Sequence, residues 1–81
     1  MPYKRRNSPR SSRIAVLGGG SWGTTLALLL NDNGHEVIIW EYFSELADAI
    51  ERDRENRRFL PGVSIPRSVA VTSDIDRAMY N

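Results

Sequence analysis

The feature that most constrains this chain is a run of glycines between an apolar stretch and a helical pattern. Residues 14–17 read Ile-Ala-Val-Leu, a continuous apolar run that is typical of a strand buried on both faces of a parallel sheet. The next residues, 18–23, read Gly-Gly-Gly-Ser-Trp-Gly and fit the pattern G-x-G-x-x-G. From Ser21 to about Asn33, leucines recur at spacings of three and four, which predicts an amphipathic helix. We therefore predict a strand, a glycine-rich turn and a helix in immediate succession.

A second strand and a second helix are predicted from the next part of the chain. Residues 37–40, Val-Ile-Ile-Trp, are rich in β-branched side chains, and we expect Trp40 to fill the core beneath the following helix. Ser44 can cap that helix, which we expect to end at roughly Glu55.

The last part of the chain predicts a loop, a strand and the start of a helix. Residues 56–68 contain Pro61-Gly62 and a further proline, which are loop signals. Residues 69–72, Val-Ala-Val-Thr, predict a third short strand. Ser73 is expected to cap a last helix with acidic residues in its first turn.

The alternation of strands and helices places this chain in the α/β class. Right-handed crossovers between successive strands produce a parallel sheet. The order β-α-β-α-β-(α) matches one half of a Rossmann-type doubly wound fold, with expected strand order 3-2-1, truncated before the second half. A chain of 81 residues cannot hold both a nucleotide-binding domain and a separate catalytic domain, so we expect the latter to be absent.

Each glycine of the turn has a mechanical role in a dinucleotide site. Gly18 permits the tight turn out of the strand, Gly20 lets a diphosphate approach the backbone, and Gly23 lets the helix pack against the strand. The N–H groups and the positive dipole end of the helix then hold the phosphates. The alternative is a glycine-rich turn that binds no ligand.

Glu41 supplies the second part of such a site. A dinucleotide site uses an acidic residue about 20 residues further on, at the end of the second strand, to accept hydrogen bonds from the adenosine ribose. Glu41 lies 21 residues after Gly20, directly after the predicted strand. A carboxylate there repels a 2′-phosphate, and Tyr42, not an arginine, follows it, so we expect NAD rather than NADP. The alternative is an ordinary charged residue at a strand end.

The charge of the chain is unevenly distributed. Residues 1–13 carry five basic and no acidic side chains, whereas the remainder carries a net charge of −4. The basic segment has no aliphatic side chain to bury, so we expect a disordered, solvated arm over 1–12. An organelle transit peptide or a nucleic-acid-binding arm stays open as the alternative. Because the ordered part is acidic, we expect no nucleic-acid partner.

Composition excludes several other classes of protein. The longest apolar run, Leu26–Leu30, has 5 residues, whereas a membrane span needs roughly 20. The chain has no cysteine, which excludes disulfides and thiolate zinc sites, and we expect no metal site. It also lacks the apolar run of a secretory signal, so we expect a cytoplasmic location.

Two segments together resemble the start of NAD(P)-dependent glycerol-3-phosphate dehydrogenase. The first contains Gly-Ser-Trp-Gly-Thr at residues 20–24, and the second contains Leu-Pro-Gly at residues 60–62, shortly after Glu-Asn. The resemblance covers roughly residues 13–81, which would be a partial N-terminal NAD-binding domain. It implies that the cofactor is contacted by residues of the glycine loop and of the second strand end: Gly18, Gly19, Gly20, Ser21, Trp22, Gly23, Glu41 and Tyr42.

The resemblance also implies a reaction for the whole enzyme. This is reversible hydride transfer between the nicotinamide and dihydroxyacetone phosphate, giving sn-glycerol 3-phosphate, a precursor of glycerophospholipids. The catalytic lysines of the family have no counterpart among these residues, so we expect no catalytic residue here and no activity of this chain alone. Many bacterial members have arginine at the position of Tyr42, a departure that also weighs against NADP. Another β-hydroxyacid-type dehydrogenase, a non-catalytic NAD-sensing module and a homodimer are left open.

Overall fold

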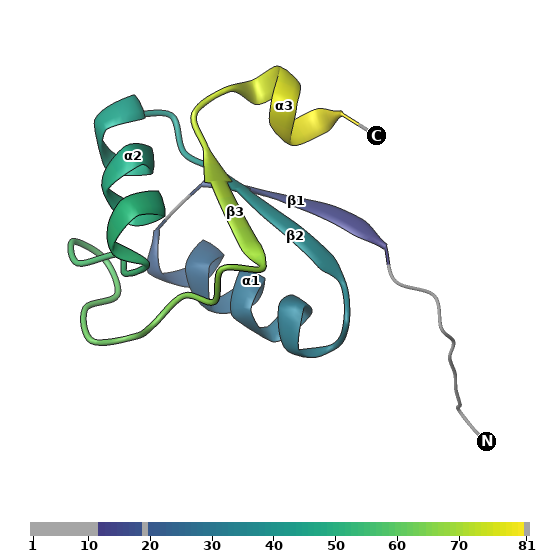
Figure 1. Cartoon of the computed structure of the whole chain (residues 1–81), viewed down its shortest axis with the longest axis horizontal. Helices are drawn as coiled ribbons and strands as arrows, with labels where there is room; N and C mark the ends of the chain where they lie inside the picture. Colours follow the sequence, from purple (N-terminus) through teal and green to yellow (C-terminus); the bar gives the residue numbers. More distant parts are fainter. Residues whose placement is uncertain (1–11, 19, 81) are drawn as a thin grey trace.

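The computed structural model describes residues 12–18 and 20–80, which form three strands and three helices (Figure 1). Residues 1–11, the greater part of the predicted arm, lie outside the described residues, as do Gly19 and Asn81. The disorder predicted for the arm therefore stays a prediction. In chain order the elements are β1 (Arg13–Leu17), α1 (Ser21–Asp32), β2 (Glu36–Trp40), α2 (Ser44–Asp53), β3 (Val69–Thr72) and α3 (Ile75–Met79).

The three strands form one parallel sheet in the order β1-β2-β3. Val16 of β1 lies opposite Ile39 of β2, which in turn lies opposite Val71 of β3. This is the predicted order 3-2-1 counted from the other edge of the sheet. The α/β class and the parallel pairing predicted from the sequence are confirmed.

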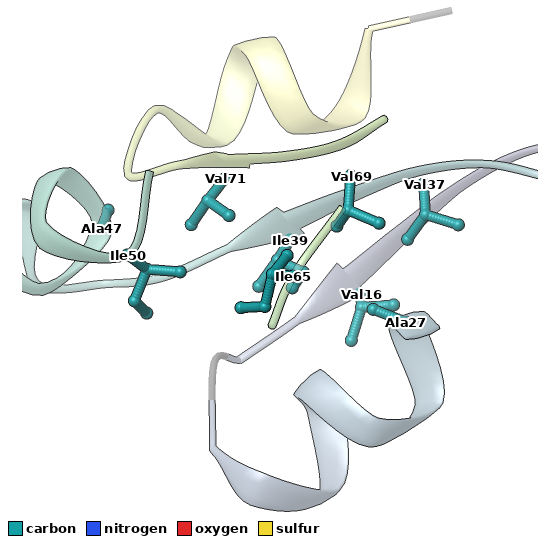
Figure 2. Close-up of a cluster of buried hydrophobic side chains, with 9 residues drawn as sticks. All are labelled: Val16, Ala27, Val37, Ile39, Ala47, Ile50, Ile65, Val69 and Val71. Carbon is teal, nitrogen blue, oxygen red and sulfur yellow. The ribbon is translucent and has the colours of Figure 1, made fainter. Parts of the chain in front are cut away.

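One face of the sheet carries the hydrophobic core (Figure 2). Alternate residues of each strand point to this face, as the two-residue period of a strand requires. Ile39, in the middle strand, is only 1% exposed. The core joins strand residues to side chains of α1, α2 and the loop after α2: Val16, Ala27, Val37, Ile39, Ala47, Ile50, Ile65, Val69 and Val71.

The opposite face of the sheet is only partly covered. Helix α3 lies on this side (Figure 1), and a groove of about 900 Å³ separates its end from the strands. Ala15, Ile38 and Ala70 line the sheet side of the groove, and Met79 lines the helix side.

Trp40 lies away from the core, and its predicted position beneath α2 is wrong. Strand alternation puts Trp40 on the side of Ile38 because its neighbour Ile39 occupies the core side. Its indole Nε1 donates a hydrogen bond to the carbonyl oxygen of Ser73 at 3.0 Å. Trp40 therefore ties the end of β2 to the segment that follows β3.

Both predicted serine caps are displaced by one residue. Helix α2 begins at Ser44, with Phe43 in the N-cap position and no side-chain cap bond. Helix α3 is capped by Asp74, whose carboxylate accepts the backbone N–H groups of Asp76 and Arg77, rather than by Ser73. An aspartate in this position satisfies two N–H groups that have no partner inside the helix.

Arg54 ends α2 and closes the loop that leads to β3. It has a left-handed backbone (φ 55°), so the helix stops at Asp53, before the predicted Glu55. Its guanidinium forms an ion pair with Glu51 at 3.4 Å. The same group donates hydrogen bonds to the carbonyls of the returning chain, at Ile65, Pro66 and Val69.

Within the described part of the chain, no helix is long and apolar enough to cross a membrane.

Candidate functional site

The candidate site lies at the carboxyl edge of the sheet, where the three strands end. The backbone N–H of Gly18, just after β1, donates to the carbonyl of Trp40 at 2.8 Å. The N–H of Glu41, just after β2, donates to the carbonyl of Thr72 at 2.8 Å. These bonds extend the parallel pairing beyond the strands and bring the glycine turn and Glu41 to the same edge. In open α/β sheets, ligands bind at this edge.

Two glycines of the turn are required by the fold. Gly18 has φ +115°, a conformation that side-chain-bearing residues rarely adopt. A Cβ on Gly23 would lie 2.2 Å from the carbonyl oxygen of Gly18, closer than any real contact. The absence of a side chain at Gly23 therefore lets α1 begin directly against the end of β1, as the sequence predicted.

Gly20 differs from Gly18 in its backbone conformation and from Gly23 in the open space beside it. A Cβ at this position would meet no atom within 4 Å, and its φ of −71° is accessible to any residue. The fold itself does not need a glycine at position 20. Because Gly20 has no side chain, access to the first turn of α1 is unobstructed.

The first turn of α1 is suited to an anion. Gly20 occupies the N-cap position and offers no side-chain cap, and no acidic residue lies in the first turn. The turn is closed by the N–H of Thr24, which donates to the carbonyl of Gly20 at 2.9 Å. The preceding N–H groups have no acceptor within a helix, and the helix dipole adds a partial positive charge there. Ser21 and Trp22 are both exposed in this turn, and Trp22 is 83% exposed.

Glu41 is held in a defined orientation at the end of β2. Its side chain is largely buried, with 7% of the residue exposed. The carboxylate oxygen Oε2 accepts the backbone N–H of Phe43 at 3.1 Å. A carboxylate oriented in this way presents acceptor oxygens to hydroxyl donors and a negative charge to any phosphate.

The two residues that follow Glu41 are aromatic and exposed. Tyr42 is 69% exposed and Phe43 is 60% exposed. The Tyr42 ring makes edge-to-face contacts with Trp40, at a centroid distance of 6.1 Å, and with Phe43, at 5.1 Å. Large apolar side chains exposed together mark a surface that something else covers. Phe43 was absent from the predicted site, although its place directly after Tyr42 was the available signal.

The arginines near the end of α2 form surface ion pairs rather than an anion site. Arg52 and Arg57 each contact the Asp53 carboxylate at 3.0 Å. The hydrogen bond from Arg52 lowers the pKa of Asp53 and, for the same reason, raises the pKa of Arg52.

Among the described residues, no group of three potential ligands could hold a metal ion.

Comparison with known proteins places this chain in a family. The family model described as "NAD-dependent glycerol-3-phosphate dehydrogenase N-terminus" matches residues 13–81. The chain belongs to this family. The glycerol-3-phosphate dehydrogenase resemblance noted in the sequence is therefore confirmed, and the matched residues begin with the first residue of β1.

Similar proteins include curated enzymes and solved structures. The proteins named glycerol-3-phosphate dehydrogenase [NAD(P)+] of Bacillus thuringiensis (strain Al Hakam) and Bacillus cereus (strain AH187) are each 47% identical over 70 residues, covering 86% of this chain and 21% of theirs. A crystal structure of glycerol-3-phosphate dehydrogenase from Coxiella burnetii matches with a TM-score of 0.80 and 36% identity, covering 85% of this chain and 21% of that one.

The glycerol-3-phosphate dehydrogenase of Plasmodium falciparum matches with a TM-score of 0.74 and 25% identity, covering 86% of this chain and 22% of that chain. This chain thus spans about a fifth of the length of the glycerol-3-phosphate dehydrogenases that it matches.

In this chain, the predicted site residues that the structure describes gather at one edge of the sheet. Gly18, Gly20, Ser21, Trp22 and Gly23 form the turn and the first turn of α1, and Glu41 and Tyr42 follow β2. Gly19 lies outside the described residues.

Proposed function

We propose that this chain supplies the dinucleotide-binding part of an NAD(P)-dependent glycerol-3-phosphate dehydrogenase. The observation that carries the proposal is the open space at Gly20, which a side chain would fill and which leads to the first turn of α1. Family membership and the carboxylate of Glu41 at the same edge support the same assignment. When bound, the nicotinamide cofactor supplies or accepts the hydride.

The glycine turn would hold the cofactor diphosphate. The backbone N–H groups of the first turn of α1 would donate to phosphate oxygens, helped by the positive end of the helix dipole. Gly20 would permit the close approach, while Ser21 and Trp22 would contact the phosphates from the exposed side of the turn. The role of Gly18 and Gly23 would be to hold this backbone in place.

Glu41 would bind the adenosine ribose and select NAD over NADP. Its fixed carboxylate can accept hydrogen bonds from ribose hydroxyls and would repel a 2′-phosphate. Tyr42 follows at the place where a basic side chain would favour the phosphate, and its exposed ring offers the adenosine an apolar surface instead.

The whole enzyme would use this site to interconvert dihydroxyacetone phosphate and sn-glycerol 3-phosphate in the cytoplasm. The described residues bind and orient the cofactor, and we place no acid–base or substrate-binding group among them. The only lysine of the sequence, Lys4, lies outside the described residues. We therefore expect residues 1–81 alone to show no turnover.

The decisive experiment expresses the protein from its complete reading frame and titrates it with NADH and NADPH by calorimetry. We expect binding of NADH, and oxidation of NADH when dihydroxyacetone phosphate is added. Gly20→Val should abolish the binding.

Three other results are informative. Binding without turnover of any offered substrate would favour the NAD-sensing module. Turnover of a β-hydroxy acid instead would favour another β-hydroxyacid-type dehydrogenase. Failure of the unaltered protein to bind either dinucleotide would overturn the proposed site.

A further inference from the structure

Asn56 is the one fully buried polar residue of the loop after α2 among the described residues. It lies three residues beyond the end of the helix and is 0% exposed. A buried amide costs free energy unless its donors and acceptor are satisfied, so its partners reveal what it holds. Figure 1 shows the loop that contains it reaching back toward the beginning of α1.

The two ends of the Asn56 side chain hold two different segments. Nδ2 donates to the hydroxyl oxygen of Thr24 in the first turn of α1, at 3.3 Å. Oδ1 accepts the backbone N–H of Phe59 at 3.2 Å, and the carbonyl of Asn56 accepts the N–H of Leu60 at 2.7 Å. Because the backbone N–H of Phe59 requires an acceptor, Oδ1 faces it and Nδ2 is left to donate to the Thr24 hydroxyl.

Thr24 connects this amide to the glycine turn. It is 1% exposed, and its backbone N–H donates to the carbonyl of Gly20 at 2.9 Å. The bond from Asn56 therefore reaches the residue that closes the first turn of α1, where the proposed diphosphate site lies. This contact joins residues that are separated by 32 positions in the sequence.

We propose that Asn56 is a positioning residue of the dinucleotide site, acting through Thr24 on the backbone of the glycine turn. The inference rests on the proposed function, because it assigns a role within that site. Asn56 does not touch the cofactor in this scheme. It holds the N–H groups of the turn in the arrangement that phosphate oxygens require, and preorganisation of this kind raises affinity.

A double-mutant cycle on cofactor binding tests the proposal. Asn56→Ala removes the donor, and Thr24→Val removes the hydroxyl while it keeps the shape of the side chain. Each change should weaken NADH binding on the order of tenfold in calorimetry with the protein from the complete reading frame. The double variant should bind no more weakly than the worse single variant, because the two side chains act through one contact.

Two further variants separate positioning from general stability. Thr24→Ser keeps the hydroxyl and should restore near-normal affinity. Asn56→Asp keeps the acceptor for Phe59 but loses the donor and adds a negative charge near the turn, so it should raise the KM for NADH with kcat retained. Asn33→Asp, the same change at the exposed far end of α1, is the matched control and should leave the KM unchanged.

The outcomes distinguish this inference from the proposed function. If the unaltered protein does not bind NADH, the proposed function is wrong and the role of Asn56 falls with it. If it binds NADH but the folded Thr24→Val and Asn56→Asp variants bind equally well, only the role of Asn56 is overturned. Additive losses in the double variant would also contradict an effect transmitted through Thr24. Should Asn56→Ala fail to fold, the Thr24 and Asn56→Asp variants still decide.

Discussion

The face of the sheet under α1 and α2 and the carboxyl edge of the same strands use apolar side chains in opposite ways. On the face, Ile39 and Val69 are almost completely buried. At the edge, Trp22, Tyr42 and Phe43 remain mostly exposed, although they are larger and consist mainly of apolar rings. The two regions lie within a few residues of each other along β2, so local sequence preference does not explain the contrast.

The difference indicates that the packed face stabilises the fold, whereas the exposed edge is where we propose that the cofactor binds. Substitutions on the packed face should lower the free energy of unfolding. Cofactor affinity should then change only as a consequence of the weakened fold. Substitutions at the edge should change affinity and leave the fold intact. The following predictions test that division, and all use the protein from its complete reading frame.

Truncation of the core centre should have the largest effect. Ile39→Ala removes a 1% exposed side chain beneath both helices and should lower the free energy of unfolding by about 2–5 kcal/mol, measured by urea titration. Tyr42→Ala removes more atoms from an exposed position and serves as the control, with a loss of less than about 0.5 kcal/mol. Equal losses of unfolding free energy in the two variants would contradict the contrast between the packed face and the exposed edge.

A branched side chain at Gly20 should damage binding and spare the fold. Gly20→Val enters open space, so the free energy of unfolding should fall by less than about 1 kcal/mol, as for a weakened N-cap. NADH affinity should fall by about 100-fold or more, or roughly 2.7 kcal/mol, because the side chain occupies the proposed diphosphate position.

Gly23→Ala, in the same glycine-rich segment, should mainly destabilise the fold. Its Cβ would meet a backbone oxygen at 2.2 Å, so the free energy of unfolding should fall by about 1–3 kcal/mol. A stable Gly23→Ala protein alongside an unstable Gly20→Val protein would reverse the roles assigned to the two glycines.

Neutralising Glu41 should alter cofactor choice more than stability. Glu41→Gln removes the charge that repels a 2′-phosphate, so the ratio of kcat/KM for NADH to that for NADPH should fall about tenfold, or roughly 1.4 kcal/mol. Steady-state kinetics with both cofactors measure this ratio. An unchanged ratio, or equal use of both cofactors by the unaltered protein, would remove Glu41 as the selecting residue.

Loss of the α3 cap should have the smallest effect. Asp74→Ala removes an acceptor for two backbone N–H groups and should lower the free energy of unfolding by about 1 kcal/mol. Ser73→Ala, which changes the residue that the sequence alone suggested as the cap, should cost less. A larger loss for Ser73→Ala than for Asp74→Ala in thermal unfolding would contradict the observed cap.

The glycine turn, the strand order and the position of Glu41 could be predicted because each follows from a local pattern or from a general rule of parallel sheets. Periodicity locates the strands, and the turn between β1 and α1 has few chemical solutions. The cap of α3 was misplaced by one residue because Ser73 and Asp74 are both good N-cap residues and the sequence does not distinguish them. The hydrogen bond from Trp40 to the Ser73 carbonyl crosses the sheet and leaves no local signal in the sequence.

Asn56 shows why the rest of the site could not be predicted. In the sequence it is one polar residue in a loop rich in charge, and nothing nearby marks it as buried. Its importance arises from Thr24, 32 residues away, and from the returning path of the loop. Burial of a polar group of this kind becomes visible only when the chain is folded.

The groove on the uncovered face of the sheet has a thermodynamic consequence for this chain. Unfolding raises the heat capacity mainly because apolar surface becomes hydrated. In residues 12–80, side chains such as Ile38 and Ala70 already line a groove of about 900 Å³ in the folded state. The parts of these side chains that already face solvent in the groove contribute nothing to the heat capacity of unfolding. The free energy of unfolding of this segment should therefore curve less with temperature than it would if the groove were packed.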